Sequence, residues 1–198
     1  MPVPLPPEAL KTFEIVATLS GAAYVVLAAR RNRLCWIVGA VGSAFLGVVA
    51  AVRALPMQAA LQAFYVVMSV YGWWSWTRSV GDGELPIGFW PLSWHIGAAL
   101  VLIVLTFASA RLLASETHAA WPMLDSLTTW FSLLATWLTA KARLENWLYW
   151  IVIDSILAYL FYVQGMPYIA LLFVVYVVIA AAGFIGWRRR FRAQLVPA

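Results

Sequence analysis

The sequence predicts an all-α integral membrane protein with seven transmembrane helices, arranged as two parallel three-helix repeats joined by a linker helix. Three observations lead to this fold class. The 198 residues are 64% hydrophobic and only 11% charged, whereas a soluble domain carries about a quarter charged residues. The apolar stretches approach the ~20 residues that a bilayer-spanning helix needs. Finally, the first part of the chain aligns with the last.

Seven apolar segments can be marked, each close to the length of one span. Short polar or proline-containing stretches separate them, and Trp and Tyr gather at their ends, as they do at the headgroup level of a membrane. The first helix can begin a turn earlier than its apolar segment, because Pro6, Pro7 and Glu8 suit a helix start. The predicted helices cover residues 12–29, 34–52, 57–76, 93–113, 121–139, 145–163 and 167–187.

The distribution of basic residues predicts how these helices are oriented. Of the 13 Lys and Arg residues, only Lys11, Arg53 and Arg111 fall on one side of the membrane. Cytoplasmic loops are enriched in Lys and Arg, so the opposite, richer side should be cytoplasmic. The N-terminus is then outside and the C-terminus in the cytoplasm. The richer side holds Arg30, Arg31, Arg33, Arg78, Lys141, Arg143, Arg188, Arg189, Arg190 and Arg192.

An internal repeat appears when the sequence is shifted by 111 residues without a gap. Repeat one covers residues 12–78, the linker helix 93–113 and repeat two 121–190, within a single membrane domain of residues 1–198. Parallel repeats around a central substrate are a known transporter plan, although duplication also occurs in membrane proteins that transport nothing. The aligned pairs include Trp36 with Trp147, Pro56 with Pro167, Tyr65 with Tyr176, Gly72 with Gly183, and Trp76 with Trp187.

Polar residues in the sixth predicted helix indicate a binding site, because polar side chains in a membrane usually face the bundle interior or a cavity. Asn146, Trp150 and Asp154 are four residues apart and share one helix face. An aromatic ring, an amide and a carboxylate on one face suit a flat, partly cationic ring. Alternatives stay open: Asn146 and Trp150 can anchor the helix at the membrane interface. Asp154 can be a structural carboxyl, or it can couple transport to protons.

The third predicted helix carries a second polar face, formed by Gln58, Gln62 and Tyr65. Glutamines in an apolar helix are expected to point inward, where they contact a ligand or hydrogen-bond a neighbouring helix. Gln62 is the preferred ligand contact of the three. Trp36 and its counterpart Trp147 are candidate walls of the same site.

The remaining ionisable residues predict neither a metal site nor a cofactor. His95 and His118 are far apart in the sequence and Cys35 is the only cysteine, so no ligand set emerges. Nucleic-acid binding is not expected either, since the basic residues sit at helix ends rather than on a basic face. Glu14 and Asp125 are expected near helix N-termini, where the helix dipole favours anions.

Two segments resemble the PnuC-type vitamin transporter family. Residues 62–76 are similar to the third span of that family. Residues 143–154, with the pattern Arg-x-x-x-Trp-x-x-Trp, are similar to its sixth span. Trp36 and the Gly-Trp-Arg-Arg sequence at residues 186–189 agree as well. The resemblance extends from about residue 14 to residue 190.

This resemblance implies a SWEET-like three-plus-one-plus-three bundle that forms a homotrimer in a bacterial inner membrane. It also implies uptake of nicotinamide riboside by facilitated diffusion, with an intracellular kinase trapping the substrate by phosphorylation. The positions that match the ligand contacts of the family are Gln62, Asn146 and Trp150. Related members carry thiamine or riboflavin, and the presence of Asn146, Trp147 and Trp150 places nicotinamide riboside first.

Two other classes of function fit the sequence less well. An intramembrane enzyme would need a nucleophile with its base, or a set of metal ligands, and the predicted spans contain neither. A membrane scaffold would explain the repeat but not the polar face of the sixth helix. We therefore expect a transporter with no catalytic residues.

Overall fold

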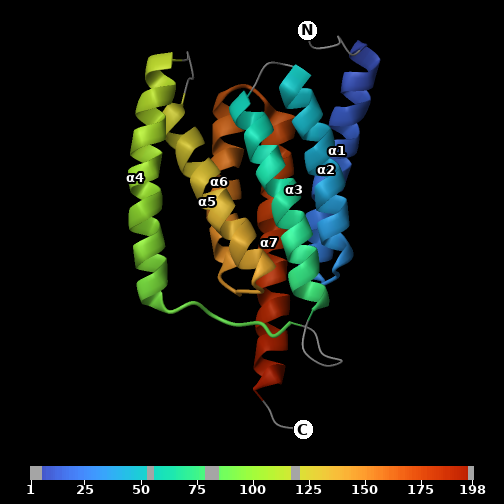
Figure 1. Ribbon diagram of the computed structural model, residues 1–198, viewed down its shortest axis with the longest axis vertical. Helices are drawn as coiled ribbons and strands as arrows, with labels where there is room; N and C mark the ends of the chain where they lie inside the picture. Colours follow the sequence, from blue (N-terminus) through green and yellow to red (C-terminus); the bar gives the residue numbers. More distant parts are fainter. Residues whose placement is uncertain (1–5, 53–55, 79–84, 117–120, 196–198) are drawn as a thin grey trace. The chain divides into compact units, whose positions relative to one another are not determined.

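The computed structural model describes residues 6–52, 56–78, 85–116 and 121–195, and these residues form seven α-helices (Figure 1). Every predicted helix is confirmed, and five of them match the prediction to within three residues at each end. Arg53 and His118 lie outside the described residues. The helices are α1 (Pro7–Ala29), α2 (Leu34–Val52), α3 (Pro56–Thr77), α4 (Leu92–Glu116), α5 (Pro122–Ala140), α6 (Asn146–Val163) and α7 (Pro167–Gln194).

The start of α1 differs from the apolar segment that predicted it. Pro6 is extended and Pro7 occupies the first helical position, where its missing N–H costs nothing. Glu8 therefore lies in the first turn, and the expectation that Glu14 sits at the helix N-terminus is wrong. The same expectation is confirmed for Asp125, which lies in the first turn of α5.

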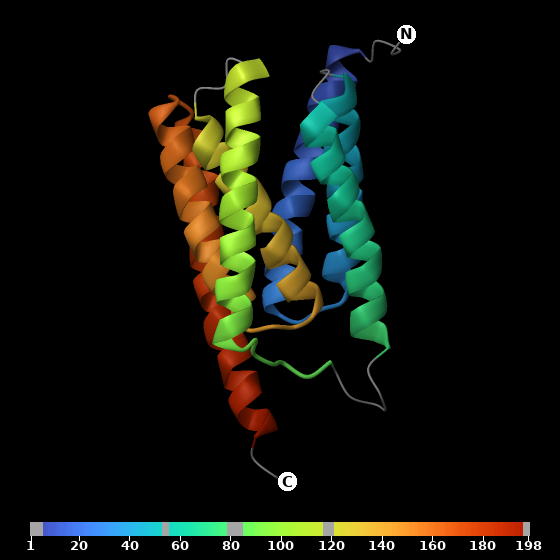
Figure 2. The same ribbon diagram turned by 60° about the vertical axis from the view of Figure 1, so that its left-hand side comes forward.

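The end of α7 lies seven residues beyond its apolar segment, at Gln194. Figures 1 and 2 show α7 extending past the ends of α4, α5 and α6. The extension carries the basic residues Arg188, Arg189, Arg190 and Arg192. Cations near a helix C-terminus interact favourably with the helix dipole, which explains why a run of arginines continues the helix instead of ending it.

The chain divides into two compact units, Met1–Pro86 and Ile87–Ala198. In the first unit α2 packs against both α1 and α3. In the second unit α5 packs against α4 and α6, and α6 packs against α7. The predicted linker helix, α4, thus belongs to the same compact unit as the three helices of the second predicted repeat.

Five helices, α1, α2, α4, α6 and α7, are long and apolar enough to cross a membrane. The outer surface of α4 fits this environment, since Leu100 is 62% exposed and Val104 is 66% exposed. Contiguous apolar surface of this kind is unfavourable in water and suits lipid. By contrast, α5 buries polar residues against its neighbours, including Ser132, Thr136 and Thr139, and is correspondingly less apolar.

The turns that precede α2 and α6 have the same geometry, 111 residues apart. Arg31 and Ala142 both adopt the left-handed conformation, with φ of 61° and 51°. Two hydrogen bonds from the turn back into the preceding helix complete a Schellman motif. The longer-range one joins Asn32 N to Leu27 O in the first turn and Arg143 N to Leu138 O in the second, each at 2.9 Å.

Each unit also contains a buried pair of tryptophans in the same edge-to-face arrangement. Trp36 and Trp76 have ring centroids 5.4 Å apart at an interplanar angle of 87°, and Trp147 and Trp187 have the same two values. Such perpendicular pairs are favoured by the ring quadrupoles. The pair joins α2 to α3 in the first unit and α6 to α7 in the second.

Glycines allow these tryptophans to approach the neighbouring helix. A Cβ atom on Gly72 would overlap the indole ring of Trp36, and one on Gly183 would lie 2.8–2.9 Å from the ring of Trp147. In both places the added Cβ atom would lie closer to the ring carbons than two non-bonded carbon atoms can approach. Gly72 and Gly183 are therefore needed for close packing between helices.

Candidate functional site

The α6 face predicted from the four-residue spacing is turned towards the interior of its unit. Asn146 is fully buried, Asp154 is buried, and Trp150 is half-buried. Asn146 is the first residue of α6, so the preceding turn fixes the position of its side chain. The face begins at this turn and runs along α6 from Asn146 through Trp150 to Asp154.

A hydrogen-bonded network joins Asn146 and Trp150 through Thr139 of α5. Thr139 Oγ1 lies 3.1 Å from Asn146 Oδ1, and Trp150 Nε1 donates to Thr139 Oγ1 at 3.4 Å. Asn146 Nδ2 donates to the carbonyl oxygen of Arg143 at 2.5 Å. An amide nitrogen carries two N–H donors, so one N–H of Asn146 makes no hydrogen bond with the described residues. Asn146 thus keeps one N–H donor without a partner among the described residues, beside the half-buried Trp150 ring.

Asp154 lies deeper along the same face and makes no hydrogen bond with any residue that the structure describes. Tyr176 of α7 lies near its carboxylate. An isolated carboxylate removed from water is costly unless a cation or a proton accompanies it. The predicted alternative, a structural carboxyl bonded to a Ser or Tyr on a neighbouring helix, has no such bond in the described residues. Asp154 therefore calls for either a bound proton or a positive charge beside it.

In the first unit, Gln62 is the buried member of the polar face on α3. It is 5% exposed, and its amide makes no hydrogen bond with the described residues. Tyr65 is half-buried, whereas Gln58 is exposed. The expectation that both glutamines point inward is thus wrong for Gln58, which is the third residue of α3 and lies at the end of its unit.

Trp36 and Trp147, the two predicted walls, are fully packed in their own units. Trp36 is 1% exposed and Trp147 is 2% exposed, because each lies between a glycine and a second tryptophan. The structure gives both residues a packing role between helices. Contact of either ring with a ligand stays a prediction.

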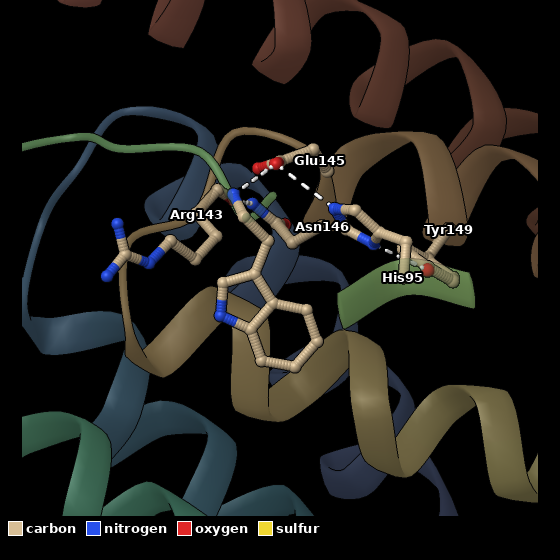
Figure 3. A network of polar contacts seen from close by, with 6 residues as sticks. His95, Arg143, Glu145, Asn146 and Tyr149 are labelled. Atoms are coloured by element: carbon tan, nitrogen blue, oxygen red, sulfur yellow. Dashed lines mark hydrogen bonds and ion pairs between the residues drawn. The ribbon is translucent and has the colours of Figure 1, made fainter. Parts of the chain in front are cut away.

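A second network lies next to Asn146 and was missed by sequence reasoning (Figure 3). The backbone N–H of Trp90 donates to Glu145 Oε1 at 2.6 Å, and His95 Nε2 lies 3.2 Å from the same oxygen. His95 Nδ1 lies 2.9 Å from the Tyr149 hydroxyl. These contacts tie the start of α4 to the start of α6. The available signal was a carboxylate directly beside the asparagine of the sixth-span motif.

Two backbone hydrogen bonds attach the segment before α4 to the turn before α6. Gly88 N donates to Ala142 O at 3.1 Å, and Leu144 N donates to Gly88 O at 3.0 Å. The guanidinium of Arg143 passes directly over Gly88, where a Cβ atom would overlap it. Figure 3 shows this guanidinium pointing away from Glu145. The turn that carries Asn146 is therefore attached to the segment before α4.

An apolar cavity of about 330 Å³ lies between α5 and α6. Its lining includes Phe131, Leu148, Tyr149 and Val152 but neither Asn146 nor Trp150. Helical periodicity places Leu148, Tyr149 and Val152 on a different side of α6 from the polar face. A lining of this composition suits a hydrocarbon chain better than a polar solute, so we do not place a polar ligand there.

Comparison with known proteins gives a consistent family. Residues 11–189 match the family model described as nicotinamide mononucleotide transporter. The chain is 27% identical to the nicotinamide riboside transporter PnuC of Escherichia coli (strain K12), over 90% of this chain and 85% of that protein. It is 25% identical to the riboflavin/roseoflavin transporter RibM of Streptomyces davaonensis, over 72% of this chain and 69% of that protein.

A solved structure has the same fold. The crystal structure of the vitamin B3 transporter PnuC superposes with a TM-score of 0.74 and 20% sequence identity, covering 91% of this chain and 82% of that one. At this identity the match concerns the fold.

Proposed function

Because this chain belongs to the nicotinamide mononucleotide transporter family, we propose that it takes up nicotinamide riboside across a bacterial inner membrane by facilitated diffusion. It is a multi-pass membrane protein and a vitamin transporter of the PnuC family. The observation that carries our choice of substrate is the α6 face. There, half-buried Trp150 and the unused N–H of Asn146 lie on the same face as the buried carboxylate of Asp154.

This face is complementary to the nicotinamide riboside ring system. The ring is flat and positively charged, and it bears a carboxamide whose oxygen accepts hydrogen bonds. Trp150 offers a stacking surface, Asn146 offers a donor to the carboxamide, and Asp154 offers the counter-charge. The family resemblance adds Gln62 of α3 to the proposed ligand contacts, and its amide has no partner among the described residues. The proposed mechanism requires no cofactor and no catalytic residue.

The related vitamins fit this face to different degrees. Riboflavin, suggested by the resemblance to RibM, has a flat but uncharged ring, and its binding would leave the Asp154 carboxylate buried without a cation. Thiamine carries a positive charge but presents no carboxamide to Asn146. Charge thus separates nicotinamide riboside from riboflavin, and hydrogen bonding separates it from thiamine.

Equilibrium binding to the purified protein tests this proposal. We expect nicotinamide riboside to bind most tightly and riboflavin most weakly. Asp154→Asn should lower the affinity for nicotinamide riboside and leave that for riboflavin nearly unchanged, because only the first ligand uses the carboxylate. Riboflavin binding as tight as nicotinamide riboside binding would instead assign the chain to the riboflavin carriers.

The mode of transport can be tested in vesicles that contain no kinase. We expect uptake to stop when the inside and outside concentrations are equal, with or without a pH gradient, because facilitated diffusion supplies no driving force. Adding a nicotinamide riboside kinase inside the vesicles should then allow further accumulation. If a proton gradient alone drove accumulation, and Asp154→Asn abolished it while sparing exchange, the proton-coupled alternative would be correct.

We further propose that the C-terminus is cytoplasmic, from the ten-to-three distribution of basic residues. Ala193→Cys places a thiol on the exposed end of α7. It should resist a membrane-impermeant thiol reagent in intact cells and react once the cells are opened. Cys35 is fully buried, so it should contribute little background. Rapid labelling in intact cells would reverse the proposed orientation.

The family resemblance also leads us to propose a homotrimer. The exposed apolar surface of α4, including Leu100 and Val104, can be covered either by lipid or by a neighbouring subunit. The mass of the purified protein, corrected for bound detergent, distinguishes a trimer from a monomer.

A further inference from the structure

Thr139 of α5 lies between the two α6 side chains to which we assign ligand contacts. It is 1% exposed. Its hydroxyl oxygen is 2.8 Å from the carbonyl oxygen of Ala135, and the other two polar atoms within reach are Asn146 Oδ1 and Trp150 Nε1. One hydroxyl group therefore joins α5 to both Asn146 and Trp150.

The numbers of donors and acceptors determine how this hydroxyl is used. A threonine hydroxyl has one proton and two lone pairs. An indole N–H only donates, so the hydroxyl must accept from Trp150. Its single proton is shared between Ala135 O and Asn146 Oδ1. Contact with the hydroxyl keeps Oδ1 of Asn146 on the α5 side, which directs the nitrogen and its unused N–H elsewhere.

The other half of the chain shows that the fold does not need these polar groups. The turn before α2 has the same left-handed residue and the same Schellman hydrogen bonds as the turn before α6. At the positions 111 residues before Thr139, Asn146 and Trp150, the sequence has Ala28, Cys35 and Gly39. The same turn thus forms without a hydroxyl, an amide or an indole.

We infer that Thr139 is a positioning residue for substrate binding: it orients the Asn146 amide and the Trp150 ring together. The inference rests on the proposed function, since it assumes that both residues contact the substrate. Thr139 itself is buried beneath them and touches no ligand. Its hydroxyl increases affinity by holding the two contacts in place before the ligand arrives.

The test compares Thr139→Ala with Thr139→Ser, two variants that differ by one hydroxyl oxygen. Alanine is the residue found at the equivalent position of the first turn, so the alanine variant should fold. We expect it to bind nicotinamide riboside roughly three- to tenfold more weakly, as for the loss of one or two hydrogen bonds. The serine variant should bind within about twofold of the wild type.

Thr136→Ala is the matched control, because Thr136 is also buried on α5 but, among the described residues, its hydroxyl bonds only to Ser132 O, at 2.8 Å. It should leave affinity unchanged. A second measurement places Thr139→Ala in a Trp150→Phe background, which keeps an aromatic ring but removes the indole N–H. In the Trp150→Phe background, Thr139→Ala should reduce the affinity for nicotinamide riboside by a smaller factor than it does in the wild type.

The outcomes separate this inference from the proposed function. If the wild type does not bind nicotinamide riboside, the proposed function fails. If the wild type binds and Thr139→Ala binds equally well, or if serine does not restore binding, Thr139 has no positioning role. A loss that is undiminished in the Trp150→Phe background overturns the link to Trp150.

Discussion

Gly183→Ala should destabilise the protein strongly, although it replaces a glycine inside a helix. The new Cβ atom would lie 2.8 Å from Trp147 Cζ2 and 2.9 Å from two further ring atoms. The ring cannot move aside easily, because Trp147 is 2% exposed and its neighbour Trp187 is completely buried. Forcing an extra carbon into a packed interior costs about 1–3 kcal/mol.

The higher helix propensity of alanine opposes this loss of stability. Alanine in a helix interior is more favourable than glycine by roughly 0.5–1 kcal/mol. At Gly183 the steric cost should exceed this gain, and the melting temperature in detergent should fall. At Gly186, one turn further along α7, a Cβ atom would meet nothing within 4 Å. Gly186→Ala should therefore leave the melting temperature unchanged or raise it.

A general effect on membrane insertion or detergent binding would change the melting temperature of both variants in the same direction. It would not lower the melting temperature for Gly183→Ala while raising it for Gly186→Ala. Equal melting temperatures for the two variants would mean that Trp147 does not pack on α7 as described. Gly72→Ala extends the test to the first unit, where the overlap with Trp36 is more severe. We expect that variant to lose at least as much stability as Gly183→Ala.

The helices were predictable from the sequence because a segment that crosses a membrane must be apolar over about 20 residues. Apolar length and the prolines at Pro122 and Pro167 define where a helix begins, and the structure agrees closely. The C-terminal end of α7 was not predictable in this way, since a run of arginines marks the edge of the bilayer but does not end a helix. Likewise, Pro7 starts α1 earlier than apolarity alone indicates.

The candidate site was predictable only in part. The spacing of Asn146, Trp150 and Asp154 depends on the period of one helix, and their inward direction follows. The role of Thr139 depends on a contact between two helices, which periodicity does not report. Gln58 shows that a shared face does not guarantee burial: it lies on the same helical face as Gln62, but it is near the start of α3 and is exposed.

The contacts of Glu145 could not be predicted for the same reason. Its partners, Trp90 and His95, are 55 and 50 residues away in the sequence. The Gly88 hydrogen bonds to the turn before α6 and the packing of α4 on α5 bring them together. In the sequence, Glu145 is one charged residue near the end of a predicted helix. A charge at that place is usually explained by the contact of the helix end with water.

Trp150→Ala should weaken nicotinamide riboside binding by about tenfold to a hundredfold, or roughly 1–3 kcal/mol. The change removes the stacking surface and exposes the bound ring to water. Asn146→Ala should cost about 1 kcal/mol or somewhat more, because it leaves a polar group of the ligand without its partner. Titration of the purified variants with nicotinamide riboside measures both effects.

Tyr149→Phe is the control for this face of α6. Tyr149 lies next to Trp150 in the sequence, but it lines the apolar cavity and its hydroxyl lies 2.9 Å from His95 Nδ1. The substitution keeps the ring and removes only the contact with His95, so nicotinamide riboside should bind nearly as tightly as to the wild type. If Tyr149→Phe weakened binding more than Trp150→Ala, the substrate would lie on the cavity side of α6. The polar face of Asn146, Trp150 and Asp154 would then have a role other than binding the vitamin ring.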